Sequence, residues 1–255
     1  LLAAVGYIIS ISIYVRIFPD SAGSRERAPY KERFRSLLDV WPVLVIFLAV
    51  VGGIYSGWCT PTEGAAVGAA GTGLLALVNG GLTWKTLIES ILSTASATAM
   101  IFFIVFGASI YNGFLALSHV PVELANWVVE LGLNPWAVLV LILCIYLVLG
   151  CVMDSLSMIL LTIPIFFPIV TVLDYGLGSE EFALWFGIVV LIVVEVGLIT
   201  PPVGMNLFVI NSMANETPLS STFKGVVPFI MSDLIRTAIL VMFPSITLVL
   251  LRLLY

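Results

Sequence analysis

Charged residues are scarce in this sequence. Asp, Glu, Lys and Arg make up 10% of its 255 residues, whereas hydrophobic residues make up 61%. A soluble globular domain carries roughly 25% charged residues, and a disordered chain is poor in apolar ones, so the composition excludes both classes. The mean hydropathy is +1.18, and several apolar runs approach the ~20 residues that a membrane-spanning helix needs. The sequence therefore predicts an all-α, polytopic membrane protein.

Cysteine and histidine are also rare, with three cysteines and one histidine in the whole chain. Cys59, Cys144 and Cys151 lie in or beside apolar runs, and they form no CxxC motif and have no paired histidine. This pattern supports neither a disulfide framework nor a His/Cys metal site. We expect the three cysteines to be buried free thiols.

Basic residues are few and unevenly placed. Six of the ten lie in a polar stretch from Arg16 to Asp39, which we expect to be a cytoplasmic loop. A basic surface for anionic lipid or nucleic acid is the weaker interpretation, because short basic loops between membrane helices are common. The preceding run, residues 1–15, lacks an initiator Met and a signal-peptide n-region, so we expect a chain cut inside a helix.

Proline and glycine interrupt the apolar run of residues 182–214. Pro201 and Pro202 have no N–H, so a helix through them would leave the carbonyls of Gly197 and Leu198 open. Thr200 precedes a proline and is therefore biased toward an extended conformation. The sequence predicts a broken helix with two open carbonyl acceptors.

The broken helix can be read in two ways. A simple proline kink, relieved by hydroxyl side chains or water, is the structural alternative. The break, however, also carries the polar groups of Glu195, Thr200 and Asn206 within twelve positions. Because unpaired backbone at membrane depth survives only where protein or a wet cavity covers it, we favour a binding site.

Two short apolar runs, 136–152 and 156–173, precede this segment, with Asp154 and Ser155 between them. At 1.5 Å per residue each run would barely cross the hydrocarbon core. We therefore expect a re-entrant helical hairpin with its tip at residues 150–157. Two full spans would satisfy the charge distribution equally well, so the hairpin hypothesis depends on run length and on Asp154.

A second polar break lies at Thr60, Pro61, Thr62 and Glu63. Thr60 or Thr62 can cap the following helix, and Glu63 suits its positive end. Small residues after it allow close helix approach. A tight turn with a good N-cap and a substrate-gating role remain equally open for this motif.

The other elements divide the chain into four parts. We expect a helix end and basic loop over 1–40, helices of the TPTE region over 41–135, hairpin and broken helix over 136–214, and a last transmembrane helix over 215–255. Pro42 should lie in the first turn of a helix over 42–57. A helix over 95–117 should follow a separate amphipathic piece, and residues 226–251 should form one run in which Asp233 and Arg236 pair.

Four segments together closely resemble the large membrane subunit of tripartite ATP-independent periplasmic (TRAP) transporters. They are GIYSGWCTPTEGAAVGA (53–69), MDSLSMILLTIPIFFPIV (153–170), GLITPPVGMNLFVI (197–210) and NSMANETPLSSTFKGVVPFIMSDLIR (211–236). The resemblance implies an all-helical, sodium-driven elevator-type carrier of the bacterial inner membrane, built from inverted repeats. It also implies a small membrane subunit and a periplasmic substrate-binding protein as partners. Only the second repeat is matched.

The candidate site combines this family likeness with the residue chemistry. Half-helix ends expose carbonyls suited to a hard monovalent cation and N–H groups suited to an anion. The expected Na⁺-binding residues are Gly150, Asp154, Ser155, Gly197, Thr200 and Gly204. The expected substrate-binding or gating residues are Thr60, Pro61, Thr62, Glu63, Pro201, Pro202 and Asn206. Asp154 is the weakest member, because it can instead cap the hairpin.

The function indicated is sodium-coupled import of a small organic acid, such as a C4-dicarboxylate or a sugar acid, with no enzymatic step and no cofactor besides Na⁺. The alternative is another hairpin-type, ion-coupled organic anion carrier that works without a binding protein. An intramembrane protease fits poorly: Asp154 and Asp233 have no GxGD context, and His119 is badly placed to act as a base for serine. We expect lipid as the surrounding medium and no nucleic-acid partner.

Overall fold

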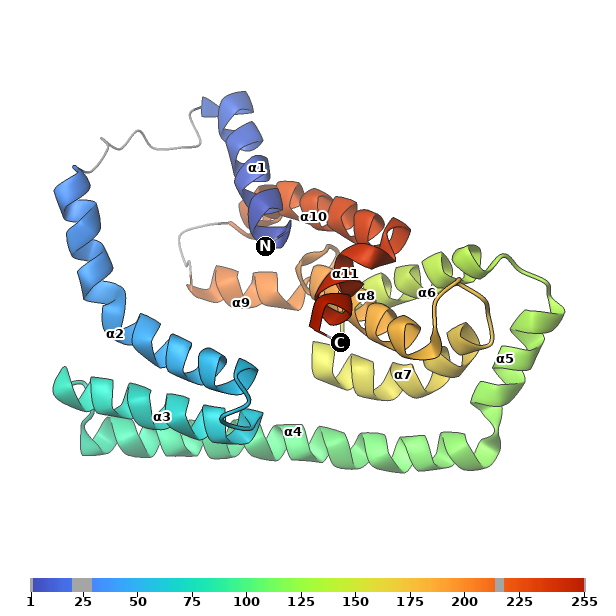
Figure 1. The fold of residues 1–255 in the computed structure, drawn as a ribbon, viewed down its shortest axis with the longest axis horizontal. Coiled ribbons are helices and arrows are strands. Elements are labelled where there is room, and N and C mark those ends of the chain that lie inside the picture. The colour runs from blue at the N-terminus through green and yellow to red at the C-terminus, as the bar shows by residue number, and fades with distance from the viewer. Residues whose placement is uncertain (1, 20–28, 214–217, 255) are drawn as a thin grey trace. The chain divides into compact units, whose positions relative to one another are not determined.

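The computed structural model describes residues 2–19, 29–213 and 218–254, and these fold into eleven helices (Figure 1). Two compact units are formed, Leu1–Ala22 with Phe102–Tyr255, and Gly23–Ile101. Within the described ranges, α4, α8 and α10 are long and apolar enough to cross a membrane. In chain order the helices are α1 (Leu2–Ile17), α2 (Tyr30–Tyr55), α3 (Pro61–Val78), α4 (Trp84–Ser118), α5 (Val120–Glu130), α6 (Pro135–Gly150), α7 (Ser155–Thr171), α8 (Ser179–Ile199), α9 (Met205–Met213), α10 (Leu219–Met242) and α11 (Pro244–Leu254).

In the smaller unit, α3 packs against α2 through glycines. A Cβ added to Gly64 would lie 2.8 Å from the Cδ1 of Ile54, and one added to Gly71 would lie 3.1 Å from the Cγ1 of Ile46. Glycine at these positions lets the two backbones approach closely, which is the usual way of packing helices in lipid. The expected close approach of this small-residue segment is confirmed.

Helix α2 begins earlier than the sequence predicts. Residues 31–39, expected in the basic loop, are helical, and Pro42 lies inside α2 instead of in its first turn. The stretch is rich in Lys, Arg, Glu and Leu, whose helix propensity favours continuing the helix. Proline removes one backbone bond there without ending the helix. The rest of the predicted loop, residues 20–28 with Arg25 and Arg27, lies outside the described residues.

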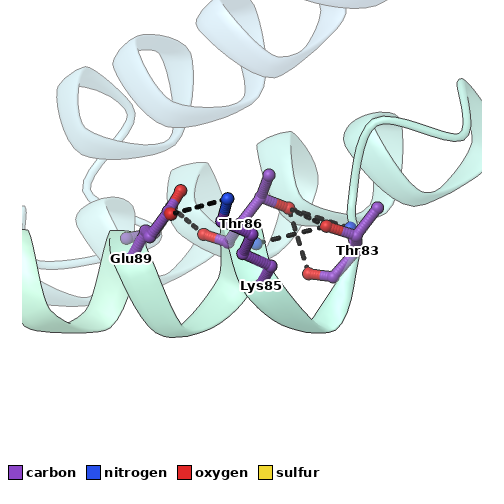
Figure 2. A network of polar contacts seen from close by, with 5 residues as sticks. Thr83, Lys85, Thr86 and Glu89 are labelled. Carbon is purple, nitrogen blue, oxygen red and sulfur yellow. Dashed lines mark hydrogen bonds and ion pairs between the residues drawn. The ribbon is translucent and has the colours of Figure 1, made fainter.

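Helix α4 is also longer than expected. Thr83 and Thr86 cap its start reciprocally: the Thr83 N–H donates to Thr86 Oγ1 (2.8 Å), and the Thr86 N–H donates to Thr83 Oγ1 (3.2 Å) (Figure 2). Lys85 and Glu89 form an i,i+4 ion pair of 3.9 Å on the same turns. The amphipathic piece and the 95–117 helix are therefore one helix of 35 residues. Its length of about 50 Å exceeds a hydrocarbon core of about 30 Å.

The core of the larger unit surrounds α8, which is apolar on all sides and is therefore suited to burial. Helices α5, α6, α7 and α11 contribute side chains to this core. Its fully buried large side chains include Leu139, Tyr146, Met158, Val170, Trp185, Phe186 and Leu248. The centre of the larger unit is thus the helix that ends in the proline-rich break.

The last apolar run is two helices, α10 and α11, and not the single one expected. Pro244 has no N–H to offer the carbonyl of Leu240, four residues earlier. The indole Nε1 of Trp185 donates to that carbonyl instead, at 2.9 Å in a buried position. A residue of α8 therefore stabilises the break between α10 and α11.

The predicted pair of Asp233 and Arg236 is confirmed, with Nη2 and Oδ1 3.1 Å apart. Asp233 is only 3% exposed, and its Oδ2 also accepts a hydrogen bond of 2.7 Å from the Tyr7 hydroxyl of α1. A buried carboxylate is tolerated when it is paired and hydrogen-bonded in this way. The contact attaches α1 to α10.

The expectation that all three cysteines are buried is wrong. All are free, but only Cys151 is buried, while Cys59 is half-buried and Cys144 is exposed on this chain. Cys144 lies on the surface of α6, in an apolar groove that α8 and α10 also line. A cysteine in an apolar run of the sequence is thus not necessarily buried by other residues of the same chain.

Candidate ion-binding site

Helices α6 and α7 form a helix–turn–helix with antiparallel arms. Thr162 donates to the Tyr146 hydroxyl across the arms at 2.9 Å, and the rings of Tyr146 and Phe166 lie 5.3 Å apart. At the open end, the Tyr175 hydroxyl donates to the Pro135 carbonyl at 3.1 Å. The turn spans residues 151–154, within the segment 150–157 expected as the tip.

Asp154 is the N-cap of α7. Its Oδ2 accepts a hydrogen bond of 2.9 Å from the Ser157 N–H. The carboxylate therefore satisfies one of the open N–H groups of the first turn and faces the positive end of the helix dipole. The capping role that the sequence left open for Asp154 is the one the structure has.

Helix α8 ends where its prolines predict. Thr200 is extended, with φ −92° and ψ 134°, the Pro201–Pro202 bond is cis, and α9 starts at Met205. The expectation of two open carbonyls is wrong for Gly197, because the Thr200 N–H donates to it at 2.9 Å in a tight cap. The Thr200 hydroxyl donates to the Val196 carbonyl at 2.6 Å. In a continuous helix the Leu198 carbonyl would accept from the N–H of residue 202, and Pro202 has none.

The turn and the break contact each other directly, as expected. An added Cβ on Gly150 would lie 3.0 Å from the Cα of Gly197, and one on Gly197 would lie 2.7 Å from the Cα of Gly150. The Gly204 N–H donates to the Cys151 carbonyl at 3.2 Å. Gly204 has a φ of +60°, a conformation that glycine adopts without strain. The turn between α6 and α7 and the break after α8 are therefore joined through their main chains.

Four helix ends meet at this contact. Helices α6 and α8 run parallel. Near the starts of the two helices the rings of Trp136 and Trp185 lie 6.2 Å apart, and near their ends Gly150 touches Gly197. Their C-termini bring partial negative charge together. Helices α7 and α9 begin just beyond, so their N-termini bring partial positive charge, part of which the Asp154 cap neutralises at α7.

Four of the six residues expected to bind Na⁺ lie at this contact: Gly150 touches Gly197, and Gly204 lies against the Thr200 carbonyl. Asp154 and Ser155 lie at the start of α7, directly after the turn. In the described part of the chain, no group of three or more His, Cys, Asp or Glu side chains could hold a metal ion. The oxygen atoms near this contact are backbone carbonyls, the Asp154 carboxylate and hydroxyls such as that of Thr200. Such oxygen atoms are suitable ligands for hard cations.

The TPTE motif belongs to the smaller unit and is satisfied locally. Thr60 Oγ1 accepts from the Glu63 N–H (3.3 Å), and Glu63 Oε2 accepts from the Thr60 N–H (2.8 Å). This is a complete capping box, with Pro61 at the first helical position and Thr62 following it. The helix-start interpretation therefore accounts for the motif without a ligand.

The remaining predicted substrate residues lie at the break. Pro201, Pro202 and Asn206 are exposed on this chain, as is Glu195 one turn before the end of α8. The carbonyl of Cys151, by contrast, was not anticipated as a contact of the site. A main-chain atom leaves no signal in the sequence, apart from its position beside Gly150.

Comparison with known proteins gives a consistent result. Residues 1–246 match the family described as "Tripartite ATP-independent periplasmic transporter, DctM component". The chain is 34% identical over 247 residues to a C4-dicarboxylate TRAP transporter large permease protein of Pseudomonas aeruginosa, which covers 96% of this chain and 56% of that protein. It is 31% identical over 229 residues to a sialic acid TRAP transporter large permease protein of Vibrio cholerae, and the match covers 88% of this chain and 51% of that protein.

A third relative is a 2,3-diketo-L-gulonate TRAP transporter large permease protein of Escherichia coli, 27% identical over 209 residues, with 81% of this chain and 47% of that protein covered. The chain spans about half the length of these relatives.

Proposed function

Because this chain belongs to the DctM component family of TRAP transporters, multi-pass permeases of the bacterial inner membrane and not enzymes, we propose that it acts in sodium-coupled import of a small organic acid. The observation that carries the proposal is the meeting of four helix ends at Gly150 and Gly197. Two C-terminal ends favour a cation and two N-terminal ends favour an anion at one position. Binding of both ions at this junction would couple their transport.

The cation is bound, in this proposal, by oxygens of the turn and the break. Thr200 supplies a hydroxyl whose lone pairs stay available, because that hydroxyl acts as donor toward Val196. Gly150, Ser155, Gly197 and Gly204 supply backbone or hydroxyl oxygens. Asp154 contributes through its cap and, by its charge, through the local field.

The anion is proposed to be a carboxylate. The three relatives named above are described as permeases for C4-dicarboxylate, sialic acid and 2,3-diketo-L-gulonate, each of which carries a carboxylic acid group. The open N–H groups at the start of α9 and the amide of Asn206 are suitable donors for it. Pro201 and Pro202 keep the approach to these donors free of helix, while Thr60, Pro61, Thr62 and Glu63 are proposed to act in gating.

The architecture proposed for transport is the second repeat of an elevator-type carrier. The α6–α7 pair would enter and leave the membrane from one side, since each arm is too short for a comfortable span. The direct contacts between turn and break support movement of the site as one body. A small membrane subunit and a periplasmic binding protein are the proposed partners.

The test is uptake by the intact permease and its small subunit in proteoliposomes, with labelled succinate and sialic acid as probes and an added binding protein. Thr200→Ala should raise the sodium concentration for half-maximal uptake by about tenfold to a hundredfold, because a hydrogen-bonding group beside a charge contributes about 1.5–3 kcal/mol. Thr200→Ser should retain the parental value. Ser212→Ala is the control, since it removes a hydroxyl that also donates to a backbone carbonyl, but in α9.

An unchanged sodium curve for Thr200→Ala would contradict the site assignment. Uptake that does not depend on sodium would contradict the coupling. Equal uptake with the binding protein omitted would favour the alternative carrier, which works without such a partner.

A further inference from the structure

The C-terminal helix α11 is joined to the first turn of α8 by a two-pronged ion pair. Arg252 Nε donates to Glu181 Oε1 at 2.7 Å, and Nη2 donates to Oε2 at 2.9 Å. Parallel N–H···O bonds of this kind fix the orientation of both side chains. Both groups remain accessible, with Arg252 49% and Glu181 30% exposed, so the pair is weaker than a buried one.

Two buried contacts reinforce the same joint. Leu248 of α11 is 1% exposed and belongs to the core around α8. One turn along α8 from Glu181, the indole of Trp185 donates to the Leu240 carbonyl that Pro244 leaves without a partner. The start of α8 is therefore held by α11 and by the break between α10 and α11.

We propose that α11 is a clamp on the start of α8, and that Glu181 and Arg252 are positioning residues for the cation site at the other end of that helix; this rests on the function proposed above. Residues 181 and 197 belong to one unbroken helix, so a shift at its start is transmitted to its end. At that end, Gly197 meets the backbone of Gly150 with no space to spare. A loosened clamp therefore reduces the fraction of molecules with a competent site, and the apparent affinity falls by the same factor.

The test uses the intact permease with all of its cysteines replaced, Cys59, Cys144 and Cys151 among them, and Leu248→Cys introduced as a reporter of α11. The first readout is the rate of labelling of that thiol by a maleimide, which requires no sodium. The second is the rise of the melting temperature with NaCl, at constant ionic strength set with choline chloride. The variants are Glu181→Arg, Arg252→Glu and the double exchange.

Glu180→Arg is the matched control. Glu180 lies in the same first turn, is exposed and makes no ion pair among the described residues. Glu180→Arg places a cation near the positive end of α8, as Glu181→Arg does, but it leaves the ion pair with Arg252 intact. Comparing the two variants therefore separates the effect of the helix dipole from the effect of the clamp.

Each single variant should raise the labelling rate about two- to fivefold, and should raise by the same factor the NaCl concentration that gives half of the rise in melting temperature (the sodium midpoint); exposed ion pairs support this range. The double exchange should bring both quantities back toward the parental values. The difference that remains should equal the effect of the helix dipole, which Glu180→Arg measures. Labelling unchanged from the control would overturn the clamp. Faster labelling with an unchanged sodium midpoint would overturn the positioning role. If sodium stabilises no variant and not the parent, the proposed function fails and the positioning role with it, while labelling still decides whether α11 clamps α8.

Discussion

Gly197→Ala is the sharpest test of the contact between turn and break. The added Cβ would lie 2.7 Å from the Cα of Gly150 and 3.0 Å from both the Gly150 carbonyl carbon and the Leu147 oxygen. All three are main-chain atoms of α6, so no side chain can rotate away. Non-bonded carbons prefer about 3.5–4.0 Å, so α6 and α8 must separate by about 1 Å at this point.

Two opposing effects set the magnitude. Alanine in place of glycine favours a helix by about 1 kcal/mol. Overpacking at a close contact costs about 1–3 kcal/mol, and here the upper part of that range applies because the backbone itself must move. The separation also stretches the hydrogen bond from the Gly204 N–H to the Cys151 carbonyl, now 3.2 Å long. We expect a net loss of about 1–2 kcal/mol in the free energy of unfolding.

The assay is the melting temperature of the intact protein with and without NaCl. At about 2–4 °C per kcal/mol, Gly197→Ala should melt several degrees lower and should lose most of the stabilisation by sodium. Gly187→Ala is the control on the same helix, because an added Cβ at Gly187 meets nothing within 4 Å. If Gly197→Ala melts like Gly187→Ala and keeps its response to sodium, the close contact of α6 and α8 does not exist.

Substitutions at three further residues test other contacts by the same melting assay. Asp154→Ala should cost about 1 kcal/mol of stability and Asp154→Asn almost nothing, because asparagine caps a helix as well as aspartate does; equal losses would contradict the cap. Thr60→Ala should cost about 1 kcal/mol through its capping box and leave the stabilisation by sodium unchanged, so a lost response would contradict the separation of this motif from the ion site. Tyr7→Phe should cost about 1–3 kcal/mol by removing a hydrogen bond to the buried Asp233 carboxylate, and a neutral result would show that α1 does not pack there.

The local features of the site follow from residue chemistry and were predictable. Pro201 and Pro202 remove two successive N–H donors, and Thr200 before them is biased toward an extended conformation, so the helix ends there. Thr60 with Glu63 forms a cap from neighbouring residues alone. The contact between the turn and the break was also predictable, because two sets of unpaired polar groups in an apolar medium satisfy each other. These inferences need only the sequence neighbourhood and the solvent.

Three other features were missed, each for a different reason. The Gly197 carbonyl was expected to be open, but the extended Thr200 turns its N–H back to it. The proline at 244 is a visible helix breaker, yet the partner for the Leu240 carbonyl comes from Trp185, 55 residues away. The early start of α2 reflects helix propensity, which outweighed the polarity that suggested a loop.

The bond between Gly204 and Cys151 joins amide to carbonyl, with no side chain taking part. Replacing Cys151 by any other amino acid keeps its carbonyl, so a scan of side chains along the turn leaves this bond in place. Replacing the amide of Gly204 by an ester, which has an oxygen where the N–H stood, removes the donor and keeps every side chain. The bond between the turn and the break thus depends on the polypeptide backbone alone. Chemical synthesis or semisynthesis can remove it, whereas side-chain mutagenesis cannot.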